Sequence, residues 1–266
     1  MLHVLAQFGG HLLTIPPHAH TDRGWHDRGW HDRGRRGDWR VRADRAGGRP
    51  GQPAQRAEWL GAVPGKYDVL SVLMREAGVD EAAVPAAVPS VEVVPATAEL
   101  TGVERGLSSK PGIELRLKRA LHEARPRDVV LIDCLPALGL LTVSGLVAAD
   151  EVLVPVLPGG IELAAVAELV DTVAEVGDGL NPGLTIGHVL VVAATDQRQR
   201  LDLDVIAALR ERFPDATLQT VIGRSVRIRE SYNRHQPITV YDPHGKASQQ
   251  YRDAARELLQ RERTPA

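Results

Sequence analysis

The sequence predicts an α/β protein with a doubly wound, mainly parallel sheet. Three short runs, at 129–133, 151–156 and 187–194, are largely apolar and lack the alternation of a half-exposed strand. Strands that are buried on both faces have this pattern. Segments with helical periodicity separate the runs, and strands that alternate with helices form parallel sheets. The ligand crevice of such a sheet lies beyond the carboxyl ends of its strands.

The other elements are expected from the same two patterns. Apolar residues that recur at helical spacing indicate helices, and short β-rich runs indicate strands. The run at 129–133 is expected to form a central strand. The further elements expected, in chain order, are a strand at 91–95, a helix at 113–124, a helix at 161–176, a helix at 203–209, a strand at 217–222 and a helix at 246–261.

The composition limits the classes of function. A length of 266 residues fits one α/β domain with a substantial core. The single cysteine, Cys134, excludes an intrachain disulfide, so a reducing cytoplasm is the expected location. The longest uncharged apolar run, between Asp133 and Asp150, falls short of the roughly 20 residues of a membrane helix and contains Pro136. We therefore expect a soluble protein without a membrane anchor.

Residues 1–66 differ in composition from the rest of the chain. They carry 11 Lys and Arg against 6 Asp and Glu, whereas residues 67–266 carry 21 against 28. The pentapeptide Asp-Arg-Gly-Trp-His occurs at 22–26 and again at 27–31, and no strand or helix period runs through 11–58. We predict a divergent, disordered basic segment over 1–66 and an α/β domain over 67–266.

Two functional alternatives exist for this basic segment. Arginines interleaved with tryptophans are typical of tails that bind nucleic acid. A metal site is the second alternative, and its candidate ligands are His18, His20, His26 and His31.

Several motifs stand in a fixed order after residue 67. The apolar run that ends in Asp133 continues as Cys134-Leu-Pro-Ala137. Together the motifs resemble those of ParA-type, Soj-like partition ATPases of the ParA/MinD group, over about residues 67–260. The other matching motifs are Val93-Val-Pro-Ala96, Leu146–Pro155, Val221–Arg227, Tyr241-Asp-Pro243 and 251–258.

The resemblance implies a sheet of the P-loop NTPase type that binds ATP and Mg²⁺. In that family a buried strand carries an aspartate to the magnesium side of the nucleotide, which makes Asp133 the candidate catalytic and metal-binding residue. Arg224 is expected at the nucleotide edge, and Arg227 and Arg229 on a surface that binds DNA without sequence preference. A ParB-like partner and a nucleotide-dependent homodimer are implied as well. Without the resemblance, Asp133 is a solvated acid closing a strand and the arginines are a solvated helix face.

The chain lacks the phosphate-binding loop of that family. The family begins with a strand and a loop of the type Lys-Gly-Gly-Val-Gly-Lys-Thr-Thr, whose backbone amides and lysine hold the phosphates. Here His3–Ala6 matches the strand, Gly9 and Gly10 are the remnant of the loop, and no lysine precedes Lys66. We therefore expect nucleotide binding and hydrolysis to be impaired.

Three hypotheses follow from this pattern. The first is a nucleotide-impaired partition ATPase homologue, and the second is a non-catalytic scaffold or regulator that keeps a partner-binding surface. The third is a frameshifted product without function, because a shifted reading frame over about 11–57 explains the divergent segment. Membrane cycling of the MinD type is disfavoured, since Glu257–Arg263 mixes both charge signs and lacks a large apolar face.

Overall fold

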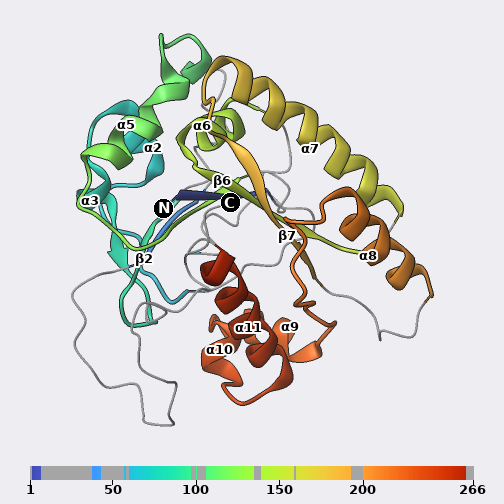
Figure 1. The fold of residues 1–266 in the computed structure, drawn as a ribbon. Helices are drawn as coiled ribbons and strands as arrows, with labels where there is room; N and C mark the ends of the chain where they lie inside the picture. Colours follow the sequence, from blue (N-terminus) through green and yellow to red (C-terminus); the bar gives the residue numbers. More distant parts are fainter. Residues whose placement is uncertain are drawn as a thin grey trace.

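A parallel-rich sheet between two layers of helices forms the body of the protein (Figure 1). The structure is a computed structural model. It describes residues 2–6, 38–42, 57, 60–96, 100, 106–134, 139–158, 160–192 and 200–261, with the backbone alone at 2–6, 38–42, 160–165 and 200–201.

The sheet has seven strands in the order β3-β4-β2-β5-β1-β6-β7. All neighbouring strands are parallel except β3, which is antiparallel to β4. The predicted fold class is confirmed, and the run at 129–133 forms the central strand. The strands are β1 Leu2–Ala6, β2 Asp38–Arg42, β3 Val84–Pro85, β4 Val91–Val94, β5 Val130–Cys134, β6 Glu151–Val156 and β7 Thr185–Val191.

Helices connect the strands, and the four helices expected from periodicity are all present. The last of them, 246–261, has the bounds that the sequence predicts. The described helices are α2 Val69–Met74, α3 Val79–Ala82, the 3-10 helix η1 Ile113–Leu115, α5 Arg116–Glu123, α6 Leu140–Ala148, α7 Gly160–Gly179, α8 Arg200–Arg212, α9 Val226–Asn233, α10 Ile238–Tyr241 and α11 Lys246–Arg261.

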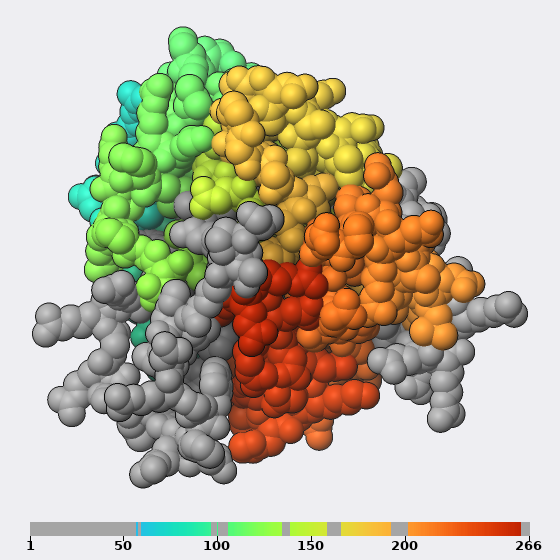
Figure 2. All heavy atoms as spheres, viewed as in Figure 1, coloured from blue at the N-terminus to red at the C-terminus, as the bar shows by residue number. Residues whose placement is uncertain are grey.

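Each face of the sheet packs against its own group of helices. On β5, Val130 and Ile132 belong to a core with α2, α3, α5, α6, α7 and α8, whereas Leu131 belongs to a second core with α11. Side chains alternate between the faces of a strand, so an uninterrupted apolar run supplies both cores. Figure 2 shows α11 packed beside α9 and α10 on one face of the molecule.

The strand β2 corrects one expectation. It lies within 11–58, where the sequence indicated no regular element, yet it pairs with β4 on one side and β5 on the other. Its sequence, Asp-Trp-Arg-Val-Arg, lacks an apolar run because three of its five residues are charged. Strands pair through hydrogen bonds between backbone groups, and a pattern of apolar and polar side chains does not reveal those bonds. The proposed division of the chain at residue 66 stays a prediction.

The strand expected at 217–222 is wrong. This segment follows β7, with a bridge between Val189 and Thr217 and a hydrogen bond from the Ile222 amide to the Val191 carbonyl at 2.9 Å, but it forms no regular strand. Side chains of α11 form hydrogen bonds with backbone groups of this segment instead. Glu257 accepts hydrogen bonds from the amides of Gln219 at 2.6 Å and Thr220 at 2.9 Å.

The apolar side of α11 is therefore fixed in the core. Tyr251, Ala254 and Leu258 are each at most 2% exposed. Arg261 donates to the Thr217 carbonyl at 2.9 Å and to Glu257 at 2.8 Å, which joins the end of the helix to the segment beside β7. None of the helices in the described ranges is long and apolar enough to cross a membrane.

The carboxylate of Glu257 makes stability depend on pH. Partial burial acts to raise its pKa, but the amides of Gln219 and Thr220 and the charge of Arg261 outweigh burial and lower the pKa. A carboxyl group with a lowered pKa in the folded state stabilises the protein fully above its unfolded pKa. That contribution is lost as the pH falls through the folded pKa.

Replacing Glu257 by glutamine should lower the free energy of unfolding at neutral pH by about 1–2 kcal/mol, because one amide loses its acceptor and the charge is removed. Urea unfolding followed by circular dichroism measures the change. The difference from wild type should be complete above the ordinary pKa of 4.5 and shrink below it. The control is Glu211→Gln on the exposed side of α8. An effect that equals the control, or that does not change with pH, would contradict this role.

Candidate functional site

The carboxyl ends of three neighbouring strands meet at one edge of the sheet. In the register of the sheet, Leu5 of β1 and Arg42 of β2 both stand beside Asp133 of β5, and Ala6 stands beside Cys134. From β1 the chain passes to strands on one side of it and then returns to β6 on the other. The end of β1 is thus the point where the winding reverses, and α/β sheets bind their ligands at such a point.

Asp133 supplies the charged group of this edge. It is 3% exposed and lies one residue before the end of β5. Burial, reinforced by the neighbouring charge of Asp133, raises the pKa of the Cys134 thiol well above its ordinary range. A thiol that stays protonated is a poor nucleophile. The chemistry of this end of β5 therefore rests on the carboxylate, and carboxylate oxygens are the ligands that Mg²⁺ prefers.

The glycines expected at the phosphates cannot be placed in the same way. Gly9 and Gly10 lie outside the described residues, as do all four histidines of the alternative metal site. Within the ranges that the structure describes, no group of three His, Cys, Asp or Glu side chains is arranged to hold a metal ion. The structure therefore places the end of β1 and, beside it, Asp133.

The structure places Arg224 after the end of β7, and Arg227 and Arg229 on α9. Arg224 is exposed in the turn before α9, two residues after Ile222, which bonds to the last residue of β7. It is on the carboxyl side of the sheet, but β1, β6 and β7 separate it in strand order from β5. Arg224 and Asp133 thus do not follow neighbouring strands, and a place for Arg224 at the nucleotide edge stays a prediction.

Arg227 and Arg229 occupy different sides of α9. Residues two apart on a helix point about 200° apart, so the two side chains do not share a face. Arg227 is paired with Glu230 at 3.0 Å, and hydrogen bonding to that carboxylate raises its pKa. Arg229 is exposed and forms no ion pair with another described residue. Arg229 is therefore the more available of the two for an external anion.

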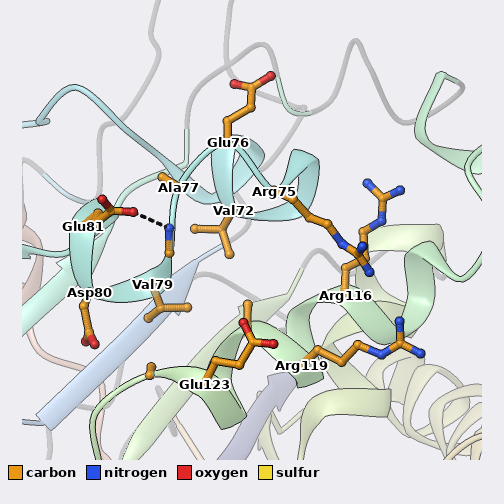
Figure 3. Close-up of a pocket in the computed structure, with 13 residues that line it drawn as sticks. Val72, Arg75, Glu76, Ala77, Val79, Asp80, Glu81, Arg116, Arg119 and Glu123 are labelled. Atoms are coloured by element: carbon orange, nitrogen blue, oxygen red, sulfur yellow. Dashed lines mark hydrogen bonds between the residues drawn. The ribbon is translucent and has the colours of Figure 1, made fainter.

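A pocket of about 640 Å³ between α2, α3 and α5 was not found from the sequence (Figure 3). Arg75, Arg116 and Arg119 line it. The spacing of three residues between Arg116 and Arg119 on an expected helix places them on one face, and this was the available signal. Arg75 comes from another part of the chain, and periodicity cannot show which helix it meets.

Comparison with known proteins identifies the family. The AAA domain family matches residues 56–186. The sporulation initiation inhibitor protein Soj of Bacillus subtilis is 37% identical over 191 residues, which are 71% of this chain and 75% of Soj. The chromosome partitioning protein ParA of Caulobacter vibrioides is 38% identical over 207 residues, 77% of each chain. This chain belongs to the ParA/Soj family of partition ATPases.

The fold of this ParA/Soj family member is also that of a solved enzyme. A crystal structure named cobyrinic acid a,c-diamide synthase from Mycobacterium smegmatis superposes with a TM-score of 0.75 at 26% identity, covering 99% of this chain and 96% of the other. That structure holds an ATP analogue and magnesium. A protein of the same fold can thus hold an ATP analogue together with magnesium.

Proposed function

We propose that this chain is a ParA-type partition protein that has lost ATP hydrolysis. It would act with a ParB-like partner in the segregation of a chromosome or plasmid. One observation carries the proposal: the carboxylate of Asp133 stands at the end of β5, but no lysine precedes Lys66. The half of the site that faces magnesium is kept, and the half that faces the phosphates is missing.

The residues present fit magnesium better than they fit a triphosphate. Asp133 can provide an oxygen ligand beside the end of β1. The phosphates carry several negative charges that a lysine and a row of backbone amides must meet at fixed positions. Gln7-Phe-Gly-Gly10 offers two glycines and no cation. Phosphoryl transfer depends almost wholly on positioning and charge stabilisation, so the loss of the loop removes most of the rate.

The same loss affects assembly. In the family the homodimer closes around bound nucleotide, so a chain that does not hold the triphosphate lacks that bridge. We therefore expect this protein to remain a monomer when ATP and magnesium are added. Its contact with a partner would then depend on surfaces of the single subunit.

Hydrolysis of ATP should be no faster for the wild-type protein than for Asp133→Asn, which keeps the shape of the buried side chain. Phosphate release in the presence of Mg²⁺ measures this. The positive control replaces the residues after β1 with the loop Lys-Gly-Gly-Val-Gly-Lys-Thr-Thr, which should introduce activity that Asp133→Asn removes. Magnesium-dependent hydrolysis by the unaltered chain, abolished in Asp133→Asn, would show that another part of the chain holds the phosphates.

Binding of duplex DNA without sequence preference is the second part of the proposal. It rests on the exposed arginines around α9, which belong to an otherwise acidic half of the chain. Arginine contacts to phosphates weaken with salt, and their number sets the salt dependence. Since Glu230 neutralises Arg227, the contribution of Arg227 is expected to be smaller than that of Arg229.

Arg229→Ala should weaken DNA binding more than Arg227→Ala and reduce the slope of log affinity against log salt by about one. Glu230→Ala should strengthen binding, because it frees Arg227 for a phosphate. Fluorescence anisotropy with a labelled duplex at several salt concentrations measures both effects. The control is Glu211→Ala on α8, which changes the net charge of the protein by the same amount as Glu230→Ala. Equal losses for the two arginine variants, or no gain for Glu230→Ala beyond the control, would place the DNA surface elsewhere.

A further inference from the structure

The pocket between α2, α3 and α5 carries opposite charges on its two sides (Figure 3). Arg75, Arg116 and Arg119 lie on one side of it, and Asp80 and Glu81 lie on the other. The volume of about 640 Å³ is in the range of sites that enclose a ligand rather than a water molecule. The arginine side of the pocket therefore differs in charge from the side that carries Asp80 and Glu81.

The three arginines differ from the other arginines near them. None of the three forms an ion pair with a carboxylate of the described residues. By contrast, Arg125 and Arg127 beside the pocket bind the carboxylate of Asp80 at 3.3 and 2.5 Å. Positive charges that are brought together without a counter-ion repel one another, and an anionic ligand relieves that repulsion.

A side-chain hydrogen bond holds one of these arginines, and a second has an unusual backbone conformation. Arg116 donates from Nη1 to the Leu73 carbonyl at 2.7 Å, which fixes its guanidinium group against the end of α2. Arg75 closes α2 in the left-handed conformation, at φ 63°, where glycine is the usual residue. A long cationic side chain at a position that favours glycine is kept at a cost in backbone energy, and such positions cluster at binding sites.

The carboxylates identify the class of ligand. Duplex DNA or a free phosphate would meet the arginines but would be repelled by Glu81 across the cavity and by Glu123, which lies on α5 beside Arg119. A ligand that carries both signs satisfies both sides, and the apolar wall of Val72 and Val79 between them suits an aliphatic stretch. We propose that this pocket binds a peptide segment of a partner protein, with an acidic side chain at the arginines and a basic one at Glu81, because the Asp80 carboxylate is already bound by Arg125 and Arg127.

The pocket is independent of the carboxyl edge of the sheet. Asp80 accepts a hydrogen bond from the Arg125 amide at 3.0 Å, and Arg125 lies in the segment that leads from α5 into β5, five residues before Val130. This side of the pocket thus lies beside the amino end of β5, whereas Asp133 lies near its carboxyl end. Peptide binding requires no nucleotide, so the inference holds whether or not the chain binds ATP.

A random peptide library displayed on phage tests the proposal on the full chain, with Arg119→Glu used for counter-selection. The enriched peptides should combine Asp or Glu with Lys or Arg a few positions away. Fluorescence anisotropy with a synthetic copy of the most enriched peptide should give affinities at least about tenfold weaker for Arg119→Glu and for Arg75→Glu. Arg119→Lys, which keeps the charge, should bind nearly as the wild type does.

Two controls separate recognition from damage to the fold. Arg212→Glu makes the same charge change on the exposed side of α8 and should bind as the wild type does. A peptide whose acidic residue is changed to lysine should regain affinity for Arg119→Glu. Failure to enrich any peptide, or equal affinity for wild type and both charge-reversal variants, would overturn the proposal. A loss of duplex DNA binding in Arg119→Glu but not in Arg212→Glu would overturn it in favour of nucleic acid.

Discussion

The pairing of β1 with β5 on one side and β6 on the other joins the two halves of the sheet. Leu2–Ala6 is in register with Val130–Cys134, and its middle three residues are in register with Glu151–Leu153. Without β1, two buried strands would each present a row of unpaired backbone groups, which is costly in a protein interior. The helices that cover both faces pack on the surface that this pairing creates. The same pairing sets the end of β1 beside Asp133.

The requirements for this fold differ from the requirements for a phosphate-binding site. Strand pairing uses backbone amides and carbonyls, so β1 and β2 can pair with β5 whatever side chains they carry. A phosphate site instead requires particular residues at particular positions, since charge and backbone shape are both needed. The strands of this chain pair as the fold requires, whereas Gln7-Phe-Gly-Gly10 contains no cationic residue for a phosphate site.

The sequence predicts those parts of the fold that depend on periodic burial. The bounds of β6 and α11 are correct to the residue, because each is a pattern of buried side chains. The pattern fails where backbone groups decide: β2 has charged residues yet pairs on both sides, and the segment at 217–222 is apolar in part yet bonds to Glu257 rather than forming a strand. The pocket was missed for a third reason, since Arg75 and Arg119 meet only in the folded chain.

Equilibrium binding of ATP in the presence of magnesium tests the central claim most directly, because binding does not depend on the rate of any later step. Isothermal titration of the full chain should give no saturable heat at millimolar nucleotide, while the same chain with the loop Lys-Gly-Gly-Val-Gly-Lys-Thr-Thr after β1 should bind one ATP. Saturable, magnesium-dependent binding to the unaltered chain, lost in Asp133→Asn, would contradict the account and show that the phosphates are held without the loop.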